Sequence, residues 1–405
     1  MGEDVAGVSQ NDITKLGPTR LLIVKTAFGL GGIERSLIEF LRHLDYSRYD
    51  VDLLLLYGPF DLIPELPEQV HLLNVGEYGI RLRLSPLYVF YYILSVLLKS
   101  LRIKGGYQRY RRQKMDVYYR SIYRYFCKDK AYDVAIAYQQ GFACEYVARF
   151  AKAKRKIMMY HHGSVEDVDY LTPWFKEADV LLTVSKDVAE KLKVAFPFAQ
   201  YHVEVIPNLL DAYFIKKQAD EYAPELKQGV LTLCTCGRIS PEKGFDLAIG
   251  AARILKEQGL AFHWYFVGDG YDKVYVESIR QRISQDGLDV CITITGFLTN
   301  PYPYLKNCDI VVIPSRFEAN PMIIQEAKIL AKPIVATKTT GALDALIDGE
   351  TGILCEIAEE SMVEGIIHLY RNPNHMDEIS ANLASLNMSL LREEFYRKWD
   401  KVLNS

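Results

Sequence analysis

The sequence lacks the features that mark several protein classes. None of its 405 residues lies in an uninterrupted apolar run of about 18, the length that a membrane-spanning helix needs. None of its seven cysteines forms a C-x-x-C pair, so we interpret them as core thiols in a reducing compartment. The polar first twenty residues contain no apolar core of a signal peptide, and we expect a loose leader on a cytoplasmic protein. The net charge is only -3, which gives no whole-chain argument for a nucleic-acid binder.

What is present is a repeated alternation of apolar, β-rich runs with amphipathic helical patterns. One set begins with RLLIVKTAF and ends near VIPN, and a second begins with VLTLCTCGRIS after an irregular stretch near residue 210. Continuous runs of Val, Ile and Leu indicate strands buried on both faces, as in parallel sheets covered by helices. The sequence therefore predicts two doubly wound, Rossmann-like α/β domains facing a central cleft. We place them at 1–208 and 209–385, with a C-terminal helix over 386–405 that returns to the first domain.

The segment 81–130 departs from this alternation. It holds 13 Lys and Arg against two acids, and its apolar run at 86–98 is too short to span a bilayer. Aromatic residues flanked by cations favour a helix lying on an anionic membrane surface, here the inner leaflet. The alternative is an ordinary buried helix followed by a solvated basic one. Single-stranded nucleic-acid grooves use similar residues, but no nucleic-acid motif accompanies them, and we expect no nucleic-acid partner.

Two glycine-containing loops follow predicted strands and precede predicted helices. The loop GLGG at 29–32 does not complete the fingerprint G-x-G-x-x-G because residue 34 is Glu, which disfavours a nicotinamide cofactor. Gly31 and Gly32 favour contact with an anion or a sugar over a mere tight turn. In the loop GRISPEKG, Arg238 and Lys243 suit a diphosphate better than they suit two solvated surface charges. The loop departs from the Walker pattern, so nucleoside-triphosphate hydrolysis is not expected.

The stretch IPSRFEANPMIIQEA carries the largest number of candidate site residues. Asn320 is expected as the N-cap and Pro321 as the first residue of a helix that continues from 322 to about 330. The helix start offers N–H groups to a phosphate. Glu318 and Glu326 can accept hydrogen bonds from sugar hydroxyls. Taken alone, Glu326 would be interpreted as a surface residue in a helix ion pair.

His161 and His162 follow the apolar run KIMMY, at the predicted carboxyl end of a strand, where ligands bind in such sheets. Alternation sends the two side chains to opposite faces, so at most one is expected in the site. A loop histidine without a function is the alternative. No matching cluster of Asp, His and Cys appears, and we expect no metal site.

These motifs occur in one order between about residues 20 and 355. They are GLGGIERSL, the His after KIMMY, VSKDVAEKL, VIPN, GRISPEKGFDLAI, FVGDG, ITGF and SRFEANPMIIQEA. With them the chain resembles the retaining glycosyltransferases of family 4, which have the GT-B fold. The resemblance is most specific at the Glu-x7-Glu element, Glu318 to Glu326, together with Arg238 and Lys243.

The resemblance implies roles for the candidate residues, with the acceptor bound by domain 1–208 and the donor by domain 209–385. Arg238 and Lys243 would hold the diphosphate of a nucleotide sugar. Glu318 would contact the donor sugar near the reacting centre, Glu326 the ribose hydroxyls, and His161 the transferred sugar. The further donor-binding positions are Gly31, Gly32, Gly296, Phe297, Leu298, Asn320, Pro321, Met322 and Ile323.

The reaction implied by this resemblance moves a hexose from a nucleotide diphosphate sugar, with UDP as the default, to a hydroxyl with retention of configuration. The expected acceptor is a lipid-linked or cell-surface glycan, and no metal or other cofactor is expected. Ala319 to Pro321 and Met159 depart from the common family pattern, which bears on the identity of the sugar. The alternatives are a nucleotide-sugar 2-epimerase of the same architecture and a sugar-nucleotide-binding protein without activity. A phosphorylase would need a pyridoxal-bearing lysine, for which no motif appears.

Overall fold

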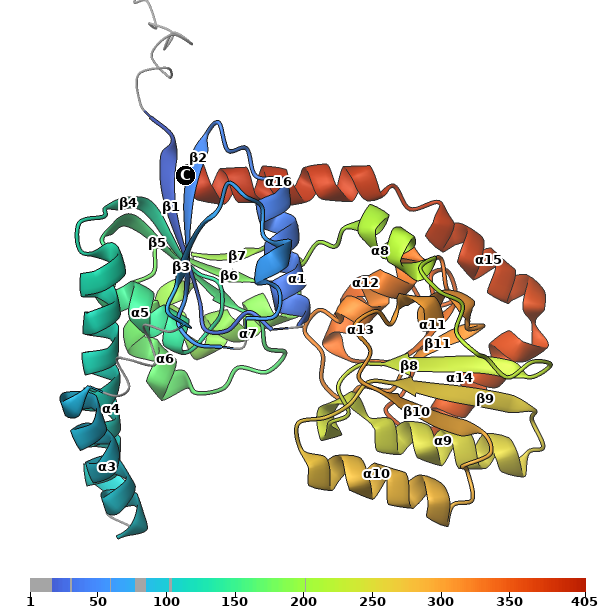
Figure 1. Ribbon diagram of the computed structural model, residues 1–405. Helices are drawn as coiled ribbons and strands as arrows, with labels where there is room; N and C mark the ends of the chain where they lie inside the picture. The colour runs from blue at the N-terminus through green and yellow to red at the C-terminus, as the bar shows by residue number, and fades with distance from the viewer. Residues whose placement is uncertain (1–16, 30, 59, 77–84, 102–103, 201) are drawn as a thin grey trace, which may run out of the picture. The chain divides into compact units, whose positions relative to one another are not determined.

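The structure, a computed structural model, describes residues 17–29, 31–58, 60–76, 85–101, 104–200 and 202–405 (Figure 1). Of the leader expected over the first twenty residues, 1–16 lie outside the described residues, and Thr19 and Arg20 belong to the first strand instead; Arg81, Arg83 and Arg102 of the basic segment also lie outside. Internal contacts divide the chain into two compact units. The first comprises Met1–Tyr160, Asp167–Leu182 and Lys193–Glu204, and the second comprises His161–Glu166, Thr183–Leu192 and Val205–Ser405.

The first unit is built on a seven-stranded sheet with the order β3-β2-β1-β4-β5-β6-β7. Its strands are β1 (Thr19–Lys25), β2 (Tyr49–Leu55), β3 (His71–Asn74), β4 (Tyr132–Ala137), β5 (Ala153–Tyr160), β6 (Val180–Thr183) and β7 (Val203–Val205). The pairs β1–β2, β1–β4, β2–β3 and β4–β5 are parallel. Residues 21–25 of β1 are all buried, as expected for a strand covered by helices on both faces.

The helices between these strands follow the apolar periodicity of the sequence. They are α1 (Gly32–Arg42), α3 (Pro86–Ser100), α4 (Lys104–Ile122), α5 (Phe142–Phe150), α6 (Val168–Phe175) and α7 (Lys186–Ala195), with short 3-10 turns at Ile63–Glu65 and Pro197–Ala199. In α1 the buried residues Leu37, Ile38 and Leu41 recur at helical spacing, which gives the helix the single apolar face that packs on the core.

The second unit repeats the same architecture with a six-stranded sheet in the order β10-β9-β8-β11-β12-β13, in which all pairs are parallel. The strands are β8 (Leu231–Cys236), β9 (Phe262–Val267), β10 (Ile292–Gly296), β11 (Ile310–Ile313), β12 (Ile334–Thr337) and β13 (Ile353–Cys355). The helices are α8 (Ala212–Ala219), α9 (Phe245–Glu257), α10 (Lys273–Gln285), α11 (Tyr302–Asn307), α12 (Met322–Ile329), α13 (Thr340–Ala345), α14 (Glu359–Arg371), α15 (Pro373–Ala384) and α16 (Met388–Asn404), with a 3-10 turn at Pro241–Lys243.

Two hydrophobic cores cover the two faces of this second sheet. Leu233 belongs to one core and Cys234 to the other, because successive side chains of a strand point to opposite faces. Cys236 packs against the same core as Cys234, which confirms that the two thiols share a face. The two predicted doubly wound α/β domains are confirmed, and the terminal helix predicted within 386–405 is α16.

The basic segment forms a pair of helices, α3 and α4, followed by a π-helical turn at Tyr123–Cys127. The alternative of a buried apolar helix is not what the structure shows for α3, of which only Ser95 is buried. In α4, Tyr118, Tyr119 and Ile122 near its end are fully covered, whereas Arg112 and Arg120 are exposed. Apolar composition shows that a helix has an apolar surface, but not which element covers it. Across the described residues, no helix is both long enough and apolar enough to cross a bilayer.

Candidate active site

The strand order of the second unit reverses between β8 and β11, which are direct neighbours. The carboxyl end of β8 leads into the loop 237–244, and that of β11 leads into the loop 314–321. In open α/β sheets, ligands bind at such a reversal, because the two loops leave the sheet on either side of a crevice. The predicted Arg238, Lys243 and Glu318 all lie on these two loops.

The loop after β8 carries both predicted cations. Arg238 donates from Nη2 to Glu242 Oε1 at 3.2 Å, and its guanidinium lies 5.7 Å from the ring centre of Tyr271. Lys243 closes the 3-10 turn, and Gly244 follows it in the left-handed conformation at φ 68°. Burial would raise the pKa of Glu242, but backbone and Ser240 hydrogen bonds and the charges of Arg238 and Lys243 hold this pKa below its usual value. One carboxylate therefore lies within the field of both cations.

The loop after β11 brings Glu318 to the same place. Lys243 Nζ contacts Glu318 Oε1, which also accepts a hydrogen bond from Ser315 Oγ at 3.0 Å. The side chain of Glu318 is 12% exposed and that of Lys243 is 27% exposed, so solvent screens this ion pair less than one on an open surface. Two residues 75 positions apart, predicted to share a site, are thus in direct contact.

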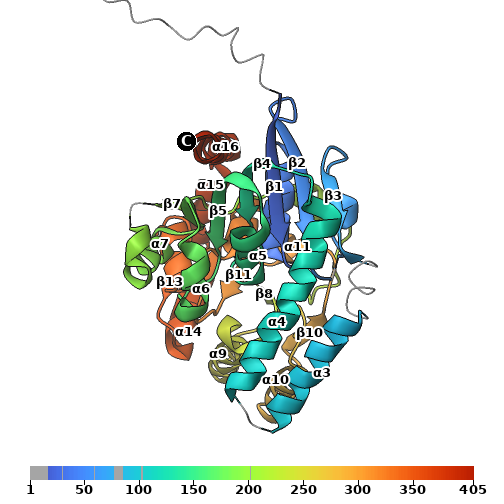
Figure 2. The ribbon, with the colours of Figure 1, turned by 90° about the vertical axis from the view of Figure 1, so that its left-hand side faces the viewer.

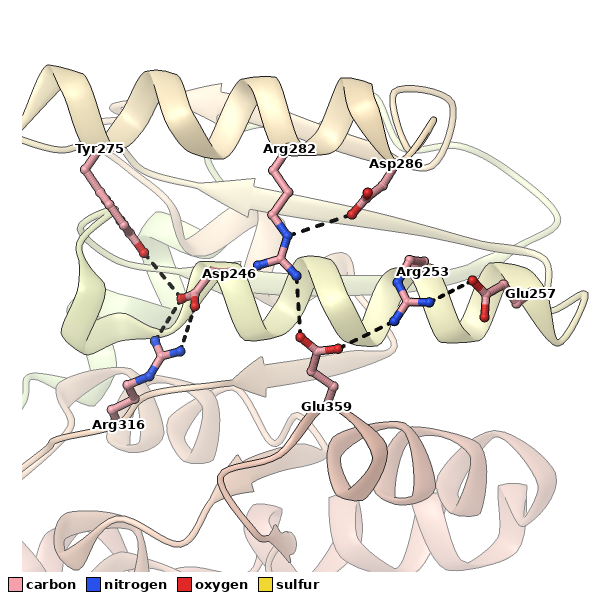
Figure 3. A network of polar contacts seen from close by, with 8 residues as sticks. All are labelled: Asp246, Arg253, Glu257, Tyr275, Arg282, Asp286, Arg316 and Glu359. Carbon is pink, nitrogen blue, oxygen red and sulfur yellow. Dashed lines mark hydrogen bonds and ion pairs between the residues drawn. The ribbon is translucent and has the colours of Figure 1, made fainter.

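Arg316, on the loop 314–321, connects this loop to the loop 237–244 and to the start of α9 (Figure 3). Its guanidinium donates to Asp246 Oδ1 at 2.8 Å and Oδ2 at 2.7 Å, and Nη1 also donates to the Pro241 carbonyl at 2.9 Å. Its backbone N–H donates to the Glu242 carbonyl at 2.8 Å. Partial burial would raise the pKa of Asp246, but the hydrogen bonds and charge of Arg316 outweigh this and lower it. This forked contact spans 70 residues of sequence, and no local pattern around either residue predicts it.

We expect Arg316→Lys to weaken this connection, because an ammonium cannot donate to both oxygens of Asp246 in the planar fork of a guanidinium. The free energy of unfolding in urea should fall by about 1–2 kcal/mol, allowing for the partial exposure of the pair. Arg253→Lys is the matched control. Arg253, in the second group of contacts drawn in Figure 3, pairs with Glu257 at 2.8 Å and lies 3.9 Å from Glu359. Equal losses in the two variants would contradict a specific role for Arg316.

The start of α12 differs from the prediction in its cap. Pro321 occupies the N-cap position with φ -67° and ψ 110°, and Asn320 does not cap the helix. Instead Asn320 Nδ2 donates to the Val184 carbonyl at 3.3 Å. A side-chain cap needs its residue directly before the first helical turn, and the helix begins one residue later than predicted. Met322 and Ile323 lie in the first turn, where backbone N–H groups point toward the crevice end of the sheet.

Glu326 lies one turn inside α12 and faces α11 and β8. Tyr302 of α11 donates from its hydroxyl to Glu326 Oε1 at 3.2 Å. Burial raises the pKa of the Cys236 thiol, and the negative charge of Glu326 raises it further, so this carboxylate is near the carboxyl end of β8. Glu326 is partly buried, and one of its partners is a buried tyrosine.

Gly296, Phe297 and Leu298 lie at the carboxyl end of β10, two strands away from β8. Gly296 has φ 76°, where a side chain is disfavoured. The ring of Phe297 is 56% exposed, while Leu298 packs partly against one core of the unit. An exposed aromatic ring beside a strand end is suited to stacking on a flat ligand. The structure does not bring these three residues into contact with Lys243 or Glu318 through any described hydrogen bond.

The predicted glycine loop belongs to the first unit, and Gly31 caps α1 from an extended conformation. A Cβ at Gly31 would lie 2.2 Å from Glu34 Oε2, so the Glu34 carboxylate lies against this loop. Glu34 pairs with Lys25 at 2.8 Å, and Lys25 is fully buried and also donates to Gln139 Oε1 at 3.2 Å. Burial lowers the pKa of Lys25, although Glu34 partly opposes this. The signal for this pair was the lysine inside the apolar run RLLIVKTAF.

Of the two histidines, the structure buries His161 and leaves His162 exposed beside Ser164, at 3.0 Å from its Oγ. This confirms that the two side chains point in different directions. Among the residues that the structure describes, no three His, Cys, Asp or Glu side chains gather as a metal site would require.

Comparisons with known proteins connect this geometry to a family. Residues 216–385 match the model of the family described as "Glycosyl transferases group 1". The chain is 30% identical over 153 residues to alpha-D-kanosaminyltransferase of Streptomyces kanamyceticus, an alignment that covers 37% of this chain and 39% of that enzyme. It is 23% identical over 309 residues to the human alpha-1,3/1,6-mannosyltransferase ALG2, covering 68% of this chain and 72% of that enzyme.

A solved structure resembles the chain over nearly its full length. Anabaena Alr3699/HepE in complex with UDP and glucose superposes with a TM-score of 0.69 at 19% identity, over 95% of this chain and 100% of that one. At this identity the likeness concerns the fold. Together with the two parallel sheets, these matches show that the chain has the GT-B fold and that residues 216–385 form a glycosyl transferases group 1 domain.

Proposed function

We propose that this protein is a retaining glycosyltransferase that moves a hexose from a UDP-sugar to a hydroxyl of a lipid-linked or cell-surface glycan. The observation that carries the proposal is the contact of Lys243 with Glu318, beside Arg238, at the strand-order reversal of the second unit. Such a group offers cations to a diphosphate and a carboxylate to sugar hydroxyls. The relatives named above are transferases, and the related Anabaena structure holds UDP and glucose, which supports a UDP-sugar donor. The comparisons give no support to a 2-epimerase.

Charge stabilisation at the leaving diphosphate is the main chemical task in this mechanism. Arg238 and Lys243 lie on one loop and can both meet phosphate oxygens, while the start of α12 offers backbone N–H groups. Binding requires each cation to exchange a carboxylate for a phosphate. The exchange costs little for Arg238, because its pair with Glu242 is about half exposed and such pairs contribute weakly.

Glu318 then becomes available to the sugar. When Lys243 turns to the phosphate, Ser315 still donates to Glu318 Oε1 and keeps the carboxylate in place. A carboxylate held in this way accepts hydrogen bonds from the hydroxyls of the transferred hexose. Proton transfer from the acceptor hydroxyl to the departing diphosphate makes a protein nucleophile unnecessary, and attack from the same face retains configuration. His161, at the carboxyl end of β5, is the proposed additional contact to the transferred sugar.

Glu326 is the proposed partner of the ribose hydroxyls. The base is proposed to stack on the ring of Phe297, next to Gly296 and Leu298. Gly31 and Gly32 of the first unit are the remaining proposed contacts to the donor. We propose that the enzyme meets its acceptor in the cytoplasm or on the inner face of the membrane, as a peripheral cytoplasmic protein. No cofactor takes part in this proposal, because the positive charge that a metal supplies elsewhere comes from side chains.

Calorimetry with UDP tests the donor and the metal independence together. We expect wild-type binding to be unchanged by EDTA, and Glu326→Ala to weaken it by about tenfold through loss of hydrogen bonds to the ribose. Glu364→Ala, at an exposed site on α14, is the matched control and should bind as wild type does. NMR of the product from a UDP-sugar that supports turnover should show the anomeric configuration of the donor. An inverted product, or binding that is lost in EDTA and restored by manganese, would refute the corresponding part of the mechanism.

A further inference from the structure

The helix α3 presents an apolar stripe to its surroundings. Leu87, Phe90, Ile93, Leu97 and Leu101 recur every three or four residues and are 51–66% exposed. At 100° per residue these five side chains fall within roughly 120° of one helix face. Single exposed apolar residues are common on protein surfaces, but a continuous stripe of large side chains marks an interaction surface.

The opposite face of α3 is occupied by α4. Tyr88 and Tyr92 lie under the ammonium of Lys114, which is 5.5 Å and 5.3 Å from their ring centres. Tyr91 packs against Tyr110 of α4 with ring centres 6.2 Å apart, and Ser95 is buried. Tyr88 and Tyr91 are thus part-buried against α4, while Tyr92 stays 51% exposed beside Lys114, and the leucine-rich face is directed away from α4.

The helix pair is fixed to the first unit through the end of α4. Tyr118 is buried and donates from its hydroxyl to the Leu56 carbonyl at 2.6 Å, and Tyr119 packs against Tyr146 of α5 with ring centres 5.7 Å apart. Figures 1 and 2 both show α3 beside the part of α4 that extends away from the sheet of this unit. The helix that carries the apolar stripe is thus attached to the first unit through the C-terminal end of α4.

The segment of sequence that carries the stripe is almost entirely positive in charge. The segment 81–130 has 13 Lys and Arg and two acids, a difference of +11. One of the two acids, Asp116, is paired with Arg120 at 2.6 Å and also contacts Arg149. Among the described side chains, Lys99 at the end of α3 and Arg112 on α4 are exposed. An apolar stripe flanked by cations is complementary to a surface that offers hydrocarbon beneath anionic groups.

We propose that α3 is a membrane-docking helix that lies in the headgroup region of an anionic bilayer, with its leucine-rich stripe toward the acyl chains. Its 15 residues extend about 22 Å, less than the hydrocarbon core of about 30 Å, so the helix lies along the surface instead of crossing it. A second copy of the chain fits this face less well. A second basic segment would supply no anionic groups to the cations of this one, whereas lipid phosphates supply the opposite charge.

The inference deepens the proposed function, since a lipid-linked acceptor would lie in the same membrane, but docking itself needs neither donor nor acceptor. Sedimentation of the full chain with vesicles of phosphatidylcholine and about 30% phosphatidylglycerol is the primary test. We expect binding that weakens as salt is raised. The variant Phe90→Ser/Leu97→Ser should lose at least about tenfold in vesicle affinity, because both side chains are exposed and contribute only when inserted.

The matched control is Val194→Ser/Val274→Ser, which removes two valines that are 81% and 82% exposed on α7 and α10. This variant should bind vesicles as wild type does, and thermal melts of both variants should match wild type. In Phe90→Trp, emission should shift to the blue on addition of anionic vesicles. Absence of vesicle binding at low salt, or equal binding by both double variants, would overturn the proposal. So would a concentration-dependent dimer lost only in Phe90→Ser/Leu97→Ser.

Failure of the proposed function gives a different pattern. Transfer of the sugar to a water-soluble acceptor should be the same for wild type and for Phe90→Ser/Leu97→Ser, because the stripe contributes no group to the site of the second unit. Vesicle binding without any transfer would support the docking helix and refute the transferase. Transfer without vesicle binding would support the transferase and refute the docking helix.

Discussion

We expect Lys243→Ala to lower kcat/KM for sugar transfer by about 10²–10³-fold, and Arg238→Ala to have an effect of the same order. The reason is the charge of the leaving diphosphate, which builds up as the bond to the sugar breaks and which these two side chains neutralise in the proposed mechanism. Fixed cations near the reacting centre stabilise the transition state more than the bound substrate, so kcat falls along with affinity. In Lys243→Ala the Glu318 carboxylate also loses its ion-pair partner, which adds negative charge near the diphosphate.

Steady-state kinetics with the best donor of a UDP-sugar panel measure this loss, with circular dichroism to show that the variants fold. Lys243→Arg separates charge from shape, because it keeps the cation and should retain more activity than the alanine variant. Arg371→Ala, at an exposed position near the end of α14, controls for the removal of one positive charge from the second unit. Near-wild-type transfer by both Arg238→Ala and Lys243→Ala would contradict the diphosphate assignment.

Gly244→Val is expected to have the largest effect on stability, lowering the free energy of unfolding by about 3 kcal/mol or more. Two causes combine at this position. Gly244 has φ 68°, a conformation that β-branched residues strongly disfavour. A Cβ built there would also lie 1.9 Å from the Pro314 carbonyl oxygen, and backbone atoms cannot move aside as a flexible side chain can. The close approach of the two loops that form the site depends on this glycine.

The comparison that isolates the packing contribution is Gly244→Ala against Gly229→Ala. Gly229 has a similar φ of 75°, but nothing lies within 4 Å of the position of its Cβ. Gly229→Ala should therefore cost only the left-handed backbone strain, about 1 kcal/mol. Gly244→Ala should cost more than this in the same urea unfolding experiment. Equal losses of unfolding free energy in Gly244→Ala and Gly229→Ala would show that the contact of Gly244 with the Pro314 carbonyl does not stabilise the protein.

Local patterns in the sequence were sufficient to predict the fold, because each buried strand is a continuous apolar run and each helix has its own periodicity. The runs around Leu233 and Val311 predicted parallel strands, and the break near residue 210 separated two domains. The family resemblance placed Lys243 and Glu318 in one site, at strand ends that meet at the same edge, but it did not predict the contact between them. The order of those strands could not be read from the sequence itself.

The elements that were missed depend on contacts between distant parts of the chain. Arg316 and Asp246 each look like ordinary surface charges, and only the folded sheet brings them together. Asn320 is a residue type that commonly caps helices, and the prediction failed because its side chain has another partner, the Val184 carbonyl. For α3, composition indicated an apolar helix correctly. Which of its faces α4 covers is decided by the tyrosines and by Lys114 in three dimensions.

The pairing of each site cation with its own carboxylate has a consequence for discrimination among cellular anions. Inorganic phosphate reaching Arg238 and Lys243 must compete with Glu242 and Glu318 for them, and it would leave Glu318 with nothing to replace its lysine. A molecule that joins a diphosphate to a polyol provides new partners for both the cations and the carboxylate at once. We therefore expect abundant small anions to inhibit the proposed transfer poorly, because only the intact donor supplies new partners to the two cations and to the carboxylate.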